Sequence, residues 1–236
     1  MDDTFGTWEP LTPAEVAGEL RGLPCRWWIA GGWAIDLHLG RQSRAHADVD
    51  VLFLRADQLS VQRHLAGWDL QAADPPGTLR PWAEGESLTM GIHDIWCRRS
   101  PSSPWSLQLM IDDTEEGAWV YRRDPRIRRP VAELDGPASN SEHRVLSPDV
   151  QLLYKSPDPR AKDESDLQSV LEYLDSSQRR LAEGVTDGGF PASSLAYPPL
   201  GRRVHTMGVR ALIGTRERIA AAREARIPSA GSHLRC

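Results

Sequence analysis

Two stretches of the chain decide the fold: IAGGWAID at residues 29–36 and HADVDVLF at residues 46–53. In the first, a short apolar run meets Gly31-Gly32 and then continues with helical spacing. In the second, aspartates alternate with apolar residues. Because successive strand side chains point to opposite faces of a sheet, Asp48 and Asp50 are expected to project to the same side. The pattern predicts a strand, a glycine turn, a helix and a second strand that brings two carboxylates to that turn.

The paired carboxylates predict a cation site. Two carboxylates this close repel each other unless a positive charge lies between them. A hard divalent cation, most simply Mg²⁺, takes oxygen ligands and keeps phosphate oxygens in its shell. Gly31 and Gly32 let a ligand approach the backbone and the N–H groups of the helix start. Together these features predict a site for a metal-bound nucleoside triphosphate, although either one alone also occurs in ordinary turns and strand edges.

The combined motif, GGWAIDLHLGR followed by SRAHADVD at residues 43–50, resembles the nucleotidyltransferase superfamily, in particular its aminoglycoside 2''-nucleotidyltransferase and lincosamide nucleotidyltransferase branch. The resemblance implies an α+β fold, in which a nucleotidyltransferase-like mixed sheet flanked by helices precedes a smaller helical domain. It implies Mg²⁺-dependent transfer of AMP, or another nucleoside monophosphate, from an NTP such as ATP to a hydroxyl of a small molecule. The expected acceptor is an aminoglycoside-like antibiotic, and the expected biological role is antibiotic resistance.

The same resemblance assigns roles to individual residues. Asp48 and Asp50 are expected to hold Mg²⁺ and to be catalytic. Phosphate binding is expected from two glycines and three basic residues, namely Gly31, Gly32, Arg44, Lys155 and Lys162. The two lysines fall in a "K…KD..D" pattern typical of these transferases. The alternative for Lys162 is a surface lysine beside a capping aspartate, and for Arg44 a solvated side chain.

A third carboxylate on a neighbouring strand is usual in these enzymes, and this chain departs from that pattern. The position expected to align with it is Gln108, which cannot accept a proton and is a poor metal ligand. Asp112 becomes the expected third catalytic residue if its strand extends two residues beyond position 111, and Asp94 on the preceding strand is a second candidate. Asp112 can equally belong to a solvated acidic turn. The departure also leaves open a nucleotide-binding protein without catalysis.

Periodicity and turn residues predict the organisation of the rest. Residues 1–140 are expected to form the catalytic domain, residues 141–185 a helical domain that completes the cleft, and residues 186–236 a tail of uncertain structure. For that tail, disorder and a homodimer contact stay open. Helices are expected at 12–20, 33–39, 57–66, from 147 and from 163, and strands at 26–30, 48–54, 68–71, 92–98, 105–111 and 119–123.

Composition limits the partners. A net charge of −5 gives no general electrostatic basis for nucleic-acid binding, and it suits a small cationic acceptor. The apolar runs are too short to cross a membrane, no signal peptide is visible, and three widely spaced cysteines fit reduced thiols in a cytoplasm. A nucleotidyltransferase acting on a protein or an RNA is the main alternative. A metal-dependent phosphohydrolase built on His93-Asp94 would need further histidines at helical spacing.

Overall fold

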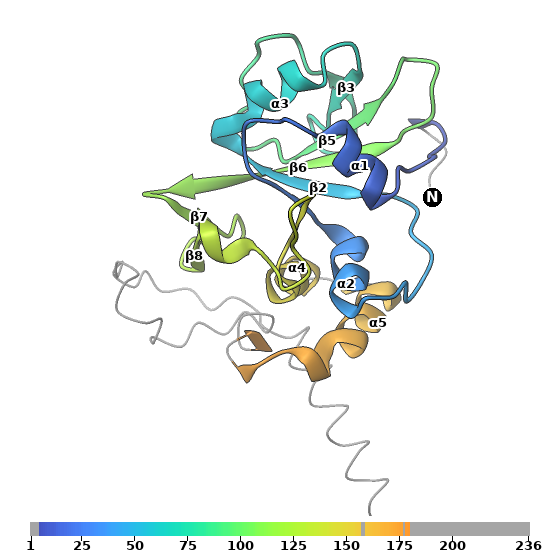
Figure 1. Cartoon of the computed structure of the whole chain (residues 1–236). Helices are drawn as coiled ribbons and strands as arrows, with labels where there is room; N and C mark the ends of the chain where they lie inside the picture. Colours follow the sequence, from blue (N-terminus) through green and yellow to red (C-terminus); the bar gives the residue numbers. More distant parts are fainter. Residues whose placement is uncertain (1–4, 157–158, 177, 180–236) are drawn as a thin grey trace, which may run out of the picture.

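The computed structural model describes residues 5–156, 159–176 and 178–179, and this part of the chain forms a mixed sheet with helices on both faces (Figure 1). The predicted α+β fold is thereby confirmed. The strands are β1 (Trp27–Ile29), β2 (Asp50–Leu54), β3 (Asp69–Ala72), β4 (Arg80–Pro81), β5 (Asp94–Arg98), β6 (Leu107–Glu115), β7 (Ala118–Val120), β8 (Arg128–Pro130) and β9 (Arg144–Val145). The helices are α1 (Pro13–Glu19), α2 (Gly31–Leu39), α3 (Gln58–His64), α4 (Pro148–Lys155) and α5 (Ala161–Val170), with single turns η2 (Arg55–Asp57), η3 (Val131–Leu134) and η4 (Leu171–Tyr173).

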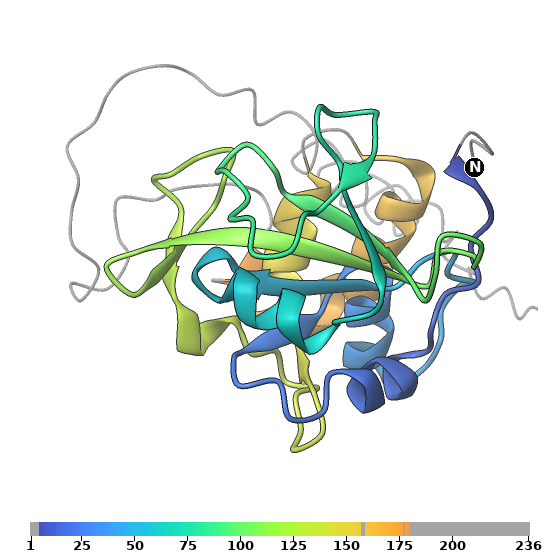
Figure 2. The same ribbon diagram turned by 90° about the horizontal axis from the view of Figure 1, so that it is seen from above.

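The strand that carries Asp50 lies inside the sheet. The strand order is β4-β3-β5-β6-β2-β1-β9, with β7 paired to β6 and β8 paired to β7. The pairs β2–β6 and β1–β9 are parallel, and the remaining pairs are antiparallel. In the β2–β6 register Asp50 lies directly opposite Gln108. Figure 2 shows β6 extending across the molecule.

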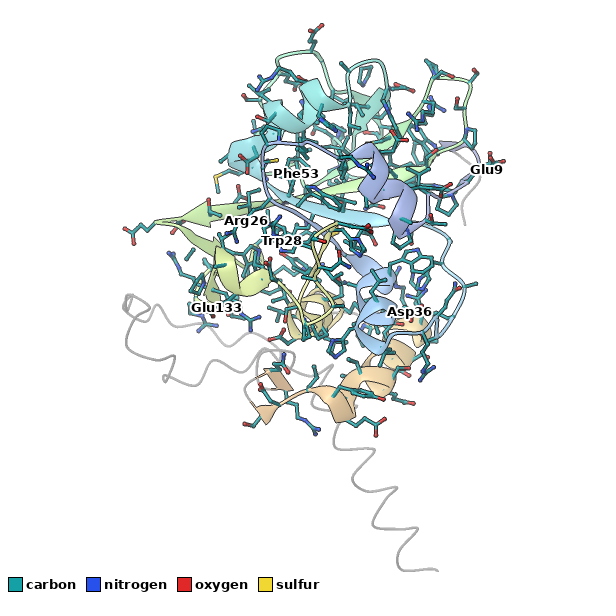
Figure 3. All side chains as sticks on the ribbon, in the orientation of Figure 1. Glu9, Arg26, Trp28, Asp36, Phe53 and Glu133 are labelled. Carbon is teal, nitrogen blue, oxygen red and sulfur yellow. The ribbon has the colours of Figure 1, made fainter. Side chains whose placement is uncertain are left out.

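The sheet has two apolar faces with different coverings. Phe53 belongs to the core under α1 and α3, whereas Trp28 belongs to the core that includes α4 and part of α2. Figure 3 shows these two side chains on opposite sides of the strands. The alternation expected of a strand thus fills two cores from β1 and β2. Because α2 and α4 cover only part of their face, its other part, over β5 and β3, carries half-exposed side chains.

Local sequence signals set the helix ends. Thr12 and Glu15 form the capping box that begins α1, within the helix expected at 12–20. Gly40, in the left-handed conformation with φ of 65°, ends α2. Asp163 accepts a hydrogen bond from the backbone N–H of Arg160, so it caps α5 as its position predicts.

Most strand boundaries differ from the sequence prediction by one or more residues, and three of the differences have a clear structural cause. Strand β2 begins at Asp50 rather than at Asp48, because β1 has already turned into α2 opposite this point. Strand β6 continues to Glu115 because β7 folds back on it as a hairpin, with Asp113 opposite Val120. The expected strand at 119–123 ends at Val120, and residues 121–127 form a tight loop.

Residues beyond position 140 share a core with those before it. Strand β9 pairs with β1, and Val150 and Leu153 of α4 pack in one cluster with Trp28. The division into domains at residue 140 stays a prediction. The expected tail, residues 186–236, lies outside the described residues. None of the described helices is long and apolar enough to cross a membrane.

Candidate active site

The site begins where β1 passes directly into α2. Helix α2 starts at Gly31, whose φ of 64° is strained for any residue with a side chain. The backbone N–H of Gly31 donates to Oε1 of Gln151 in α4, at 2.8 Å. This hydrogen bond fixes the glycine turn against the helical part of the protein. It also means that the Gly31 N–H already has a partner in the absence of a nucleotide.

Both glycines are required by close neighbours. A Cβ atom on Gly31 would lie 1.9 Å from Oδ2 of Asp50, and one on Gly32 would lie 2.2 Å from Nη2 of Arg44. Contacts this short are impossible without displacing the carboxylate or the guanidinium. The glycine pair therefore allows the functional groups of β2 and of its preceding connector to pack directly on the backbone of α2.

Asp48 and Asp50 line one cleft of about 440 Å³. Burial, together with the charge of Asp48, raises the pKa of Asp50 to about 7. Two half-buried carboxylates beside each other match the oxygen donors that Mg²⁺ prefers. No group of three or more His, Cys, Asp or Glu side chains suited to a metal occurs among the described residues.

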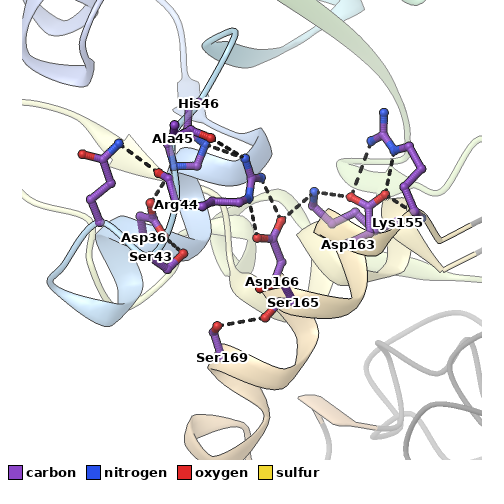
Figure 4. A network of polar contacts seen from close by, with 12 residues as sticks. Asp36, Ser43, Arg44, Ala45, His46, Lys155, Asp163, Ser165, Asp166 and Ser169 are labelled. Atoms are coloured by element: carbon purple, nitrogen blue, oxygen red, sulfur yellow. Dashed lines mark hydrogen bonds and ion pairs between the residues drawn. The ribbon is translucent and has the colours of Figure 1, made fainter.

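The basic residues predicted for phosphate binding all line this cleft, but they differ in their partners. Arg44 makes a two-point ion pair with Asp166, at 2.9 and 3.0 Å. Nζ of Lys155 lies 2.7 Å from Asp163 and 2.9 Å from Asp166 (Figure 4). Lys162 has no ion pair within the described ranges, which leaves its ammonium group available to a ligand.

The ion-pair network ties α5 to the segment before β2. Burial favours the protonated acids, yet the hydrogen bonds from Arg160 and Lys155 hold the pKa of Asp163 below its ordinary value. Burial likewise opposes ionisation of Asp166, and its bonds to Arg44 and Lys155 still lower its pKa. Both carboxylates therefore stay ionised and anchor the cations. Arg44 and Lys155 are positioned groups rather than free ones.

His46 supports the same region by orienting a carboxylate. Its Nε2 atom lies 2.5 Å from Oδ2 of Asp36 in α2, and its Nδ1 atom lies 3.1 Å from Nη1 of Arg44. The imidazole also packs against Trp33, with ring centroids 4.4 Å apart. Ser43 donates a second hydrogen bond to Asp36 (Figure 4). The connector before Asp48 is thus fixed onto α2.

Several cleft residues were not singled out in the sequence. Arg122 and Arg123 come from the loop after β7, and Gln151 and Tyr154 from α4. An arginine pair directly after a strand is a pattern that could have been noted in the sequence as a candidate phosphate-binding site. The sequence does not show, however, that the hairpin with β8 turns this loop toward the cleft. The complete lining consists of Gly31, Gly32, Arg44, Asp48, Asp50, Gln108, Met110, Arg122, Arg123, Gln151, Tyr154, Lys155, Arg160, Lys162 and Asp163.

The structure does not bring Asp112 to the cleft. Although β6 does extend past it, its side chain is 1 % exposed, and Oδ2 accepts hydrogen bonds from Tyr154 and Trp119 at 2.5 and 2.6 Å. Burial raises the pKa of Asp112. The register explains the placement, because Asp112 lies opposite Leu54, four residues along β2 from Asp50. Asp112 is an interior hydrogen-bond acceptor here, and neither a solvated turn residue nor a group facing the two aspartates.

Gln108 and Asp94 form a pair beside the aspartates. Gln108 lines the cleft next to Asp50, and its Nε2 atom donates to Oδ1 of Asp94 at 3.1 Å. Asp94 is one of the charges that raise the pKa of Asp50, so it lies within electrostatic reach of the site. A carboxylate is therefore present near the position of Gln108, but it comes from β5.

A second, larger cavity of about 820 Å³ lies at the other end of β2 and β6. Its lining includes Arg55, His93 and Asp113, and it shares Arg122 with the first cleft. Arg55 is engaged there by an ion pair with Asp113. Neither the paired aspartates nor the glycine turn reaches this cavity, so its size does not make it the better candidate for chemistry.

Residues 14–74 match the family model for aminoglycoside-2''-adenylyltransferase. This segment carries the two glycines, Arg44 and both aspartates. The resemblance predicted from the motif is confirmed. Curated 2''-aminoglycoside nucleotidyltransferases from Escherichia coli and Klebsiella pneumoniae are each 54% identical over 38 residues, which cover 16% of this chain and 20% of each relative. The chain thus spans about a fifth of the length of these relatives.

Three solved structures are also similar. The lincomycin-bound lincosamide antibiotic adenylyltransferase LnuA has a TM-score of 0.49 and 16% identity, over 70% of this chain and 100% of its own. The solution structure of the antibiotic-resistance factor ANT(2'')-Ia has a TM-score of 0.43 and 17% identity, over 90% and 92%. ANT(2'')-Ia in complex with adenylyl-2''-tobramycin has a TM-score of 0.39 and 16% identity, over 73% and 92%.

Proposed function

We propose that this protein is a Mg²⁺-dependent nucleotidyltransferase that transfers AMP from ATP to a hydroxyl of an aminoglycoside-like small molecule. The observation that carries the proposal is the pairing of Asp48 and Asp50 in one cleft with the glycine turn of Gly31 and Gly32. The match of residues 14–74 to the adenylyltransferase family supports it. The proposed setting is a cytoplasm, which the free thiols of Cys25 and Cys97 support.

The charges of the cleft are divided between its two walls. Strand β2 and the connector before it contribute the carboxylates of Asp50 and Asp48, and the connector also contributes Arg44, which is paired with Asp166. The opposite wall is mainly cationic, although it includes Asp163, and its cations come from α4, from α5 and the residue that caps it, and from the loop after β7: Arg122, Arg123, Lys155, Arg160 and Lys162. A triphosphate with a divalent cation needs this arrangement, because its phosphate oxygens require positive partners and its cation requires negative ones.

The reaction exchanges one phosphorus–oxygen bond for another. The acceptor hydroxyl oxygen bonds to the α-phosphorus of ATP, the bond from that phosphorus to the β-phosphate bridging oxygen breaks, and pyrophosphate leaves with its electron pair. One proton is released from the hydroxyl in the overall balance. Mg²⁺, when bound by Asp48 and Asp50, would supply charge neutralisation at the reacting phosphate and increase the acidity of the hydroxyl.

The chain's own residues bind and orient the reactants. Lys162 and Arg122, which have no ion pair among the described residues, are the free cations that we assign to the triphosphate. Arg44 and Lys155 keep α5 in place through ion pairs with Asp166 and Asp163. They thereby fix the position of Lys162, which is next to Asp163 in the same helix. Gly31 and Gly32 leave room for Asp50 and Arg44 against α2.

The test is pyrophosphate release from ATP and Mg²⁺ in the presence of tobramycin, kanamycin or lincomycin. Asp48→Asn should reduce the turnover by at least roughly a thousandfold, because several kcal/mol of transition-state stabilisation depend on the metal site. Glu133→Gln is the matched control, since it removes an exposed acid outside the cleft lining. Near-normal turnover of Asp48→Asn would refute the mechanism.

One observation favours a second candidate function. Gln108 occupies the position beside Asp50 where a third carboxylate was expected, so the chain could bind ATP without transferring AMP. This alternative predicts Mg²⁺-dependent ATP binding by calorimetry together with no pyrophosphate release for any acceptor. The transferase proposal predicts both binding and acceptor-dependent release.

A further inference from the structure

The wall of the cleft that carries the aspartates continues along the sheet, beyond the described lining. In the register of the strands, Asp50 lies opposite Gln108, and Gln108 lies opposite Trp96 of β5. Side chains of directly paired residues share a face of the sheet, and neighbouring strands are about 4.8 Å apart. Asp50, Gln108 and Trp96 therefore form one row, which leads away from the paired aspartates over the part of the sheet that the helices leave uncovered.

Asp94 lies on the same face, one register step from that row. It pairs with Met110, two residues along β6 from Gln108, and it receives the 3.1 Å hydrogen bond from the Gln108 amide. Its carboxylate has no cationic partner among the described residues. Asp69 of β3, further along the same face, is by contrast neutralised by Arg98 at 2.7 Å. Asp94 is thus a half-exposed, oriented carboxylate with an unsatisfied charge.

Aromatic side chains surround the end of the row that starts at Asp50, two residues along β5 from Asp94. Trp96 is half-exposed and meets Trp8, Phe5 and Trp105 edge to face, with ring centroids 5.0, 5.8 and 5.5 Å apart. The segment before α1 is held there by the backbone, since the Trp105 N–H donates to the Thr7 carbonyl at 2.9 Å. A partly exposed tryptophan next to a carboxylate suits a ring-shaped ligand with a positive group, such as an amino sugar.

The positions of the charged groups in the cleft indicate where each of the two substrates would bind. The cations on α5 and in the loop after β7 face the triphosphate, whereas the sheet side contributes the carboxylates of Asp48 and Asp50, with Asp94 of β5 beyond them. A cationic acceptor is repelled by the first wall and attracted by the second. Its reacting hydroxyl must lie at Asp48 and Asp50, so the remainder of the molecule extends over Gln108 toward Asp94 and Trp96.

We propose that Asp94 binds an ammonium group of a cationic amino-sugar acceptor, that Gln108 holds the Asp94 carboxylate in place, and that an acceptor ring lies beside Trp96. This subsite rests on the proposed transferase function and identifies which part of the sheet selects the acceptor. Gln108 is here a positioning residue. Its amide donates a hydrogen bond that fixes the orientation of the Asp94 carboxylate. A carboxylate at position 108 would instead repel Asp94.

The experiment measures tobramycin binding by calorimetry in the presence of Mg²⁺ and a non-hydrolysable ATP analogue. In Asp94→Asn the Kd for tobramycin should rise by about tenfold or more, because a charge-assisted hydrogen bond is lost. Asp69→Asn is the matched control on the same face and should change the Kd by less than about threefold. Circular dichroism and thermal melting establish that both variants are folded.

A second comparison isolates the positioning role of Gln108. Gln108→Met should weaken tobramycin binding in the native background but have little further effect in Asp94→Asn, because its contribution acts through that carboxylate. In turnover, Asp94→Asn should raise the KM for tobramycin much more than it lowers kcat. A merely structural role of Asp94 would instead change kcat and the melting temperature together.

The outcomes separate this inference from the proposed function. Equal tobramycin affinity of Asp94→Asn and the native protein would overturn the subsite, as would a native protein that binds no tobramycin. Pyrophosphate release with lincomycin alone would overturn the subsite while leaving nucleotidyl transfer intact. Tobramycin binding that depends on Asp94, without any pyrophosphate release, would support the subsite and refute the transferase.

Discussion

At the scale of single residues, the site depends on the absence of a side chain at the start of α2. A Cβ atom on Gly32 would meet Nη2 of Arg44 at 2.2 Å and the ring of His46 at 2.6 Å. Neither neighbour can move freely, because Arg44 is held by Asp166 and His46 by Asp36. The absence of a side chain is therefore a functional property of this position.

Gly32→Ala should accordingly destabilise the protein by about 1 to 3 kcal/mol, the usual cost of overpacking, and should weaken ATP binding by displacing Arg44. Urea unfolding and calorimetry with ATP measure the two effects. Gly18→Ala is the matched control. Gly18 lies in α1, and a Cβ atom there meets nothing within 4 Å, so this substitution should stabilise the helix slightly. Equal behaviour of the two variants would contradict the packing argument.

The pKa of Asp50 predicts how the metal site responds to pH. Because that pKa is raised to about 7, a proton competes with a cation for this carboxylate below neutral pH. Mg²⁺ affinity should therefore be nearly constant above about pH 8 and should fall by up to roughly tenfold for each pH unit below about 7. Calorimetric titration with Mg²⁺ over this range measures it. A flat profile down to about pH 5.5 would show that Asp50 does not take part in binding.

At the scale of elements, one ion-pair network determines where α5 lies. Asp166 accepts from Arg44 before β2 and from Lys155 of α4, so one carboxylate joins the two consecutive helices α4 and α5 to a segment that is distant in the sequence. Its side chain is 1 % exposed, whereas that of Arg44 is 20 % exposed. Lys162, which we assign to the triphosphate, depends on this placement.

Arg44→Met should lower the free energy of unfolding by about 1.5 to 3 kcal/mol, because a charge-assisted bond to a buried carboxylate is lost. Asp166→Asn should have a similar effect, and the double variant should cost clearly less than the sum, since both substitutions remove the same pair. Urea denaturation measures all three. Arg63→Met is the control, because Arg63 is exposed and, within the described part of the chain, its side chain hydrogen-bonds only to Ser60. Strict additivity of Arg44 and Asp166 would contradict the coupling.

Helices and strands also differ in how well their boundaries could be predicted from sequence patterns. The capping box of α1, the glycine end of α2 and the i, i+2 aspartates could be predicted because each signal is local. The length of β6 could not, since it depends on the pairing of Asp113 with Val120 in a hairpin. The role expected for Asp112 changed for the same reason. Its neighbours Trp119 and Tyr154 are brought to it only by tertiary structure.

At the scale of the whole molecule, the sheet and the helices after residue 140 form one packed structure. Val145 and Val150 are buried in the same core as Trp28, and Ile35 of α2 packs with Leu167 of α5. Opposite walls of the cleft therefore come from both sides of the expected boundary. The sequence suggested that boundary through a change from strands to helices, but such a change does not show which surfaces pack together.

A fragment of residues 1–140 should consequently fail to fold cooperatively, because it lacks β9 and exposes the apolar surface that α4 covers. Circular dichroism melting of the fragment beside the full chain measures this. The full chain should show one sigmoidal transition and the fragment none. A fragment that melts sharply would establish residues 1–140 as an independent domain.

The most direct test of the central claim follows the α-phosphate of ATP. The protein is incubated with Mg²⁺, tobramycin and ATP radiolabelled at either the α- or the γ-phosphate, with Asp48→Asn as the comparison. For the native protein we predict that the α-label appears on tobramycin and that the γ-label leaves as pyrophosphate. For Asp48→Asn we predict that neither labelled product accumulates at a comparable rate. Transfer of the γ-label to the acceptor, or transfer that does not depend on Asp48, would contradict nucleotidyl transfer at this site.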